Sequence, residues 1–102
     1  MNDHMAVAMT TEAIESRLGE LEECYERRLR VHPELAGKVV IHANISMTGE
    51  VDERCITEDT VDDAEIRACV NALVQNTRFP IPYDGPVDVS FPFVFTPRSA
   101  AL

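Results

Sequence analysis

The chain has 102 residues, of which 45% are hydrophobic and 26% are charged, and its net charge at pH 7 is −9. This length corresponds to one domain, and the acidic balance argues against modules that bind nucleic acid or anionic lipid, since both need a basic surface. No apolar run is long enough to cross a bilayer. Residues 10–97 are patterned and form the predicted domain. We expect residues 1–9 to be a disordered segment or a remnant of cloning, and residues 98–102 to be a disordered tail.

Residues 10–31 predict a first helix. Its apolar positions recur every three or four residues, as one face of a helix requires. Glutamates come early in this segment and arginines late, as the helix dipole prefers, and Pro33 ends the helix. The apolar positions are Ile14, Leu18, Leu21, Tyr25 and Leu29.

Residues 37–47 and 51–57 predict an antiparallel hairpin that turns near Gly49. The first strand alternates apolar and polar residues. In the second, Val51 and Ile56 are an odd number of residues apart, so a β-bulge must lie between them if both face the core.

Residues 62–77 predict a second helix. Asp62 is the predicted N-cap, with Glu65 as its capping-box partner three residues later. Its apolar face includes Ile66, Cys69 and Val70, which indicates that one side of the helix is buried.

The last strand, residues 87–95, has an apolar residue at every second position. Pro92 cannot donate a ladder hydrogen bond, so the strand is predicted to lie at a sheet edge for at least part of its length. The order helix, strand, strand, helix, strand predicts a single α+β layer pair.

The polar residues show no pattern of a catalytic or metal-binding site. His4, His32 and His42 lack the spacing of metal ligands, and the acidic run at residues 58–63 lacks the ligand order and the glycine of an EF-hand. No glycine-rich phosphate loop or nucleophile motif is present. We therefore expect no enzyme activity, no metal and no cofactor.

The three cysteines allow two interpretations. Cys24 lies beside the apolar stripe of the first helix and Cys69 on that of the second, so their thiols could meet if the helices pack side by side. The alternative, slightly favoured by the residues alone, is a pair of buried free thiols in a cytosolic protein. Cys55 alternates out of phase with Ile56, which predicts an exposed, unpaired thiol.

Several short segments, in the right order along the chain, resemble the C-terminal domain of TonB-like proteins. They are most similar to the myxobacterial domains of envelope and gliding-motility proteins, and the resemblance covers roughly residues 14–97. The segments are CYERRL (24–29), PELAGKV (33–39), GEV (49–51), EIRACV (65–70), RFP (78–80) and GPVDVSFPFVF (85–95).

The resemblance implies two helices on one face of a three-stranded antiparallel sheet. It also implies a periplasmic adaptor whose full-length parent is anchored in the inner membrane. Such an adaptor couples a proton-driven motor in that membrane to outer-membrane or envelope partners, for transport or gliding motility. An oxidising periplasm favours a Cys24–Cys69 disulfide over free thiols.

The binding site implied by the resemblance is the edge of the last strand, to which an extended segment of the partner would add as a further strand. A dimer formed through the same edge is the alternative. The residues of this edge are Val87, Asp88, Val89, Ser90, Phe91, Val94 and Phe95.

Overall fold

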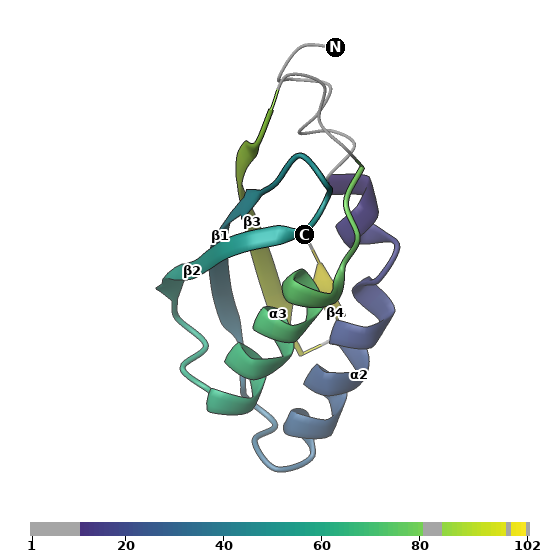
Figure 1. The fold of residues 1–102 in the computed structure, drawn as a ribbon. Helices are drawn as coiled ribbons and strands as arrows, with labels where there is room; N and C mark the ends of the chain where they lie inside the picture. Colours follow the sequence, from purple (N-terminus) through teal and green to yellow (C-terminus); the bar gives the residue numbers. More distant parts are fainter. Residues whose placement is uncertain (1–10, 81–84, 98, 102) are drawn as a thin grey trace.

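The computed structural model describes residues 11–80, 85–97 and 99–101. Helices α2 (Leu18–Leu29) and α3 (Ala64–Asn76) lie side by side over one face of an antiparallel sheet (Figure 1). The strands are β1 (Gly37–Ile45), β2 (Val51–Asp59), β3 (Val87–Thr96) and the short β4 (Ser99–Ala101), in the spatial order β2–β1–β3–β4. The predicted α+β fold and the order of its two long helices and three long strands are confirmed. The expectation for residues 1–9 lies outside the described residues.

The first predicted helix is interrupted. Residues 11–15 are helical, residues 16–17 form a turn, and α2 then begins at Leu18. At the interruption, the Ser16 hydroxyl donates to the Ala13 carbonyl at 2.8 Å, which is the kind of local bond that competes with regular helix. The predicted apolar stripe is confirmed on both sides of the turn, because Ile14, Leu21 and Tyr25 are all buried.

The β1–β2 hairpin contains the predicted bulge. Asn44 pairs with Glu53 but Ile45 pairs with Val51, so Asp52 is the extra residue. A second register shift follows Ile56, whose partner is Ile41, while Val40 pairs with Glu58. Bulges bend a strand and increase its twist, and apart from its first residue β2 has no fully buried position.

The predicted N-cap of α3 is wrong by one residue. Asp63, not Asp62, caps the helix, and its carboxylate accepts a hydrogen bond from the Ile66 N–H at 2.9 Å. The preceding turn is fixed by Asp59, whose carboxylate accepts from the backbone N–H groups of Val61 and Asp62. Asp62 then takes a positive φ of 55°, so it cannot have the extended backbone of an N-cap.

Strand β3 supplies the centre of the core. It pairs with β1 over nine positions, from Gly37 opposite Phe95 to Ile45 opposite Val87. Its side chains alternate strictly between buried and exposed, as predicted. Phe95 makes an edge-on contact with Tyr25 of α2 at 5.1 Å between ring centroids, so the odd-numbered side chains join the sheet to the helices.

The tail expected to be disordered instead contains β4. Ser99 pairs with Thr96, and Ala101 pairs with Val94. The backbone of β3 causes this difference, because a strand edge offers unpaired N–H and C=O groups to any extended segment that reaches it. A run of small residues after Pro97 carries no periodic pattern by which a strand could be predicted.

A glycine at the β1–β2 turn joins that turn to the end of α3. Gly49 has a φ of 85°, and its carbonyl accepts a hydrogen bond from the Phe79 N–H at 3.0 Å. Phe79 is buried and stacks on Phe91 with 5.9 Å between centroids. A Cβ at position 49 would overlap the Phe79 carbonyl oxygen, so the turn and the core aromatic ring need glycine there.

We predict that Gly49→Ala lowers the free energy of unfolding by roughly 1–3 kcal/mol, because the new side chain combines a strained φ with a backbone clash. Urea denaturation measures this. Gly19→Ala is the matched control: Gly19 lies in α2 with open space around it, so alanine should stabilise by about 0.5–1 kcal/mol. Equal stability of the Gly49→Ala variant and the wild type would contradict the role of this turn.

Candidate partner-binding edge

The described part of the chain covers the outer edge of β3 only in part. β1 pairs with one side of β3 along its length, and β4 pairs with the other side at Val94–Thr96. Among the residues that the structure describes, no strand pairs with this outer side between Val87 and Phe93. The uncovered stretch is therefore shorter than the predicted edge, because Val94 and Phe95 already pair with β4.

Pro92 indicates which residues face the open side. In an antiparallel sheet, alternate residues of an inner strand direct their backbone groups to alternate neighbours. Pro92 has no N–H, so the ladder between β3 and β1 keeps all of its hydrogen bonds only if the even-numbered residues of β3 face away from β1. The open edge then offers the N–H groups of Asp88 and Ser90, and the carbonyls of these two residues and of Pro92.

The same even-numbered residues direct their side chains to the sheet face that lies opposite the helices. The Asn44 amide donates to the Asp88 carboxylate at 2.9 Å, and Nδ1 of His42 lies 3.1 Å from the Ser90 hydroxyl. An open depression of about 500 Å3 lies on this face. It is lined by His42, Asn44, Asp88 and residues Asp52–Cys55 of β2.

The predicted binding residues thus divide into two groups. Val87, Val89, Phe91 and Phe95 are buried core residues, whereas Asp88, Ser90 and Val94 point outward. Sequence reasoning missed His42 and Asn44 as neighbours of this edge. Both are polar positions of an alternating strand, but which residues of β3 they meet depends on the register, which the alternation does not specify.

The other free edge of the sheet belongs to β2 and is less suited to pairing. Asp52 and Thr57 are extra residues in its two bulges, and exposed charged side chains follow one another at positions 52–54. Bulges and charges of this kind protect edge strands from pairing with other chains. The open part of β3 is therefore the better candidate for strand addition.

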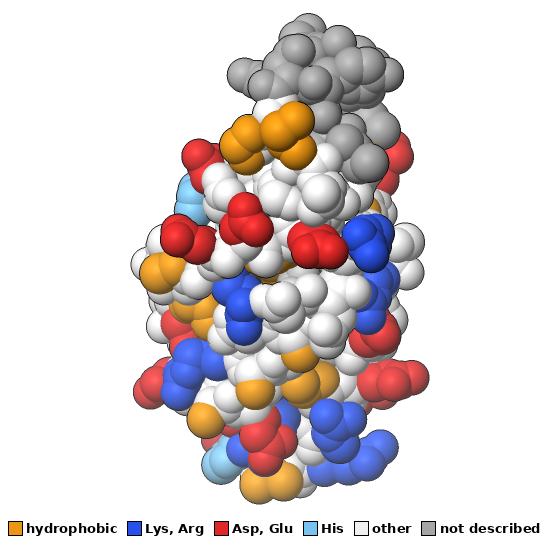
Figure 2. Space-filling model, in the orientation of Figure 1, with side chains coloured by type: hydrophobic (Ala, Val, Ile, Leu, Met, Phe, Trp, Pro, Cys, Tyr) orange, Lys and Arg blue, Asp and Glu red, His pale blue; other side chains and the backbone are white. Residues whose placement is uncertain are grey.

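On the helix face, the described residues form a smaller depression of about 190 Å3 between α2 and α3. Figure 2 shows acidic and basic side chains interspersed over this face, with small apolar areas between them. Such a mixture is typical of a solvated surface. The candidate binding surface is therefore on the sheet rather than on the helices.

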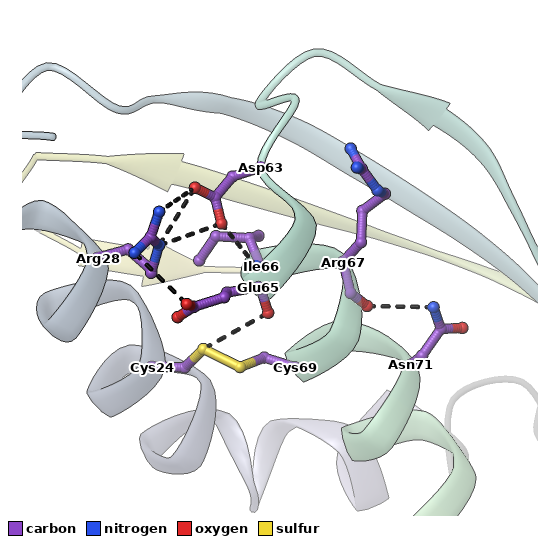
Figure 3. The surroundings of a disulfide bond; sticks show 8 residues. All are labelled: Cys24, Arg28, Asp63, Glu65, Ile66, Arg67, Cys69 and Asn71. Carbon is purple, nitrogen blue, oxygen red and sulfur yellow. Dashed lines mark hydrogen bonds and ion pairs between the residues drawn. A yellow bond between two sulfur atoms is a disulfide. The ribbon is translucent and has the colours of Figure 1, made fainter. Parts of the chain in front are cut away.

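A disulfide joins the two helices. Cys24 of α2 and Cys69 of α3 are bonded with their Cα atoms 6.6 Å apart (Figure 3), as expected from the resemblance. Cys55 is exposed and free, as predicted from the alternation of β2. Because disulfides persist in oxidising compartments, the bond is compatible with an extracytoplasmic location.

A partly buried ion pair lies beside the disulfide (Figure 3). Arg28 of α2 donates to the Asp63 carboxylate at 3.0 Å and lies 3.6 Å from Glu65. The hydrogen bond from Arg28 lowers the pKa of Asp63, and the Ile66 N–H adds to this effect, while burial opposes it. Asp63 thus caps α3 and binds α2 with the same carboxylate.

Within residues 11–80, 85–97 and 99–101, no group of His, Cys, Asp and Glu side chains could hold a metal ion. In the same part of the chain, no helix has the length and apolarity needed to cross a bilayer.

Comparisons of the chain with protein-family models, with curated proteins and with solved structures gave no match. The resemblance to TonB-like domains therefore stays a prediction from the sequence motifs. The Gly49–Phe79 contact and the Cys24–Cys69 bond each bring together two of these motifs.

We predict that replacing Cys24 and Cys69 together by alanine lowers the free energy of unfolding by on the order of 4 kcal/mol, since the bond closes a loop between residues 45 positions apart. Urea denaturation measures the loss, and Cys55→Ser, at an exposed free thiol, should leave stability unchanged. Mass spectrometry after alkylation should show a single label without reductant and a label on each cysteine after reduction. Labels on all cysteines without reductant would contradict the bond.

We predict that Asp63→Asn destabilises the domain at neutral pH and that this difference shrinks in acid. The folded-state pKa of Asp63 is lowered, so its contribution to stability is complete above the unfolded value of about 3.9 and is lost as pH falls through the folded value. Urea denaturation at pH 7 and at about pH 3 tests this. The exposed Asp52→Asn is the control, with an expected change below about 0.5 kcal/mol at either pH. A pH-independent loss in Asp63→Asn would contradict the role of the charge.

Proposed function

We propose that this chain is a periplasmic, non-enzymatic adaptor that binds an extended segment of an outer-membrane or envelope protein by strand addition to β3. The observation that carries the proposal is the open outer edge between Val87 and Phe93, beside the short strand β4. A strand edge of this kind binds an extended peptide through main-chain hydrogen bonds.

The way β3 is held suits a domain that transmits force. Its other side pairs with β1 at nine positions, and its phenylalanines are buried under the helices. A pull along the strands would load several hydrogen bonds at once rather than one after another. The anchored strand can therefore bear a load that its partner applies.

The coupling role is proposed from the order of the sequence motifs. Domains of this family act between a proton-driven motor of the inner membrane and partners of the outer membrane or envelope. In this proposal, regions N-terminal to the domain connect it to the motor, and the β3 edge holds the partner. The disulfide between Cys24 and Cys69 supports the oxidising compartment that this arrangement requires.

Self-association through the same edge is the alternative function. Two copies would then pair β3 with β3 and form one continuous sheet across a dimer. A molecular mass that rises with protein concentration in light scattering, and that stays constant after the edge is blocked, would favour this alternative.

We predict that Ser90→Pro abolishes strand addition and keeps the fold. The substitution removes an N–H that faces the open edge, while the β1 ladder loses no donor, and Pro92 shows that β3 accommodates proline two residues away. Ser90→Ala is the matched control, because it removes only the hydroxyl that contacts His42.

The measurement uses peptides selected from a random display library against the wild-type domain, titrated into isotope-labelled protein. Backbone amides of β3 should shift first in the wild type and in Ser90→Ala, and stay unshifted in Ser90→Pro. Shifts confined to α2 and α3, or equal binding to both variants, would refute strand addition at this edge.

A further inference from the structure

A strand added to β3 would place specific side chains next to one another. The even-numbered residues of β3 face the open edge with their backbone groups and the uncovered sheet face with their side chains. Residues directly opposite each other in neighbouring strands share a face, with Cβ atoms about 4.5–5.5 Å apart. The partner residue opposite Asp88 would therefore lie beside the Asp88 carboxylate.

Asp88 is the only charged residue on the open stretch of β3. Among the described residues, its carboxylate contacts the neutral Asn44 amide and lies 3.6 Å from His42, but it forms no ion pair with lysine or arginine. Its side chain is 67% exposed. A carboxylate that is this exposed and has no lysine or arginine partner can accept a cation from a new neighbour with little cost of desolvation.

Next to Asp88, the edge is uncharged. Ser90 carries a hydroxyl that is already in contact with His42, and Pro92 is apolar. A charged side chain of the partner directly opposite either residue would face no counter-charge, and from the position opposite Ser90 it would reach Asp88 only along a diagonal of about 7–8 Å. The edge therefore has a negative charge at Asp88 and none at Ser90 and Pro92. This difference distinguishes one end of a bound partner segment from the other.

We infer that the open edge of β3 selects an extended segment that carries a lysine or arginine directly opposite Asp88. Opposite Ser90 and Pro92, the segment has uncharged residues. The inference rests on the proposed strand addition and adds the chemistry and the register of the partner. Opposite charges that face each other across strands stabilise pairing, and like charges weaken it, so Asp88 fixes the register as well as adding affinity.

The test again uses display-selected peptides that shift the β3 amides. Each is resynthesised with lysine, glutamine or glutamate at the position where basic residues are enriched. The lysine peptide should bind Asp88→Asn roughly two- to fivefold more weakly than it binds the wild type. With Asp88→Lys the order should reverse, so that the glutamate peptide binds more tightly than the lysine peptide.

Glu53→Gln is the matched control. Glu53 is an exposed carboxylate of β2, and it pairs with Asn44, which separates it from β3 by the whole width of β1. The variant removes the same charge from the protein and should keep the ratio of lysine-peptide to glutamine-peptide affinity. Equal changes of this ratio in Glu53→Gln and Asp88→Asn would show attraction to the net charge alone and overturn the inference.

The remaining outcomes separate the two proposals. Peptides that shift the β3 amides but show no enriched basic position would overturn the selectivity and leave strand addition standing. If no selected peptide shifts these amides, strand addition itself fails, and the selectivity fails with it. Urea denaturation of each variant checks that the exposed substitutions leave the fold intact.

Discussion

The contact between α2 and α3 is the constraint on which the rest of the structure depends. Cys24 and Cys69 bond the two helices covalently, and Arg28 binds the carboxylate that caps α3. With the helices held together, they form one continuous cover for the phenylalanine row of β3. A domain of this size has a modest core. If α2 and α3 were not joined, either helix could move away separately and expose these aromatic rings.

Strand β3 combines two requirements that usually conflict. Its buried face must be apolar to form the core, while in the proposed function its edge must stay available without causing aggregation. The strict alternation of its side chains confines the apolar residues to the covered face. β4 covers one end of the edge and Pro92 removes a donor from the middle. The remaining stretch is short, which limits non-specific pairing with other chains.

Sequence patterns predicted the features that depend on neighbouring residues in the sequence. They missed the features that depend on contacts within the folded domain. The stripe through Leu21 and Tyr25, the bulge before Ile56 and the exposed Cys55 all follow from periodicity. The N-cap at Asp63 does not, because it depends on Asp59 folding the preceding turn around its own carboxylate. β4 was also not predicted, because it forms by pairing with the edge of β3 and not from a pattern of its own. The register that places Asp88 beside Asn44 became apparent only from the assembled sheet.

The position of the disulfide along the chain limits how far the domain can extend under tension. The chain between Cys24 and Cys69 spans 45 residues, which correspond to roughly 150–160 Å of fully extended polypeptide. This loop contains β1, β2 and parts of both helices, whereas β3 lies outside it. Even if a pull on β3 unfolds the domain, the intact disulfide keeps this loop closed. The unfolded chain is then shorter by the extended length of the loop. The oxidation state of one bond therefore sets the maximum distance between the two ends of a loaded molecule.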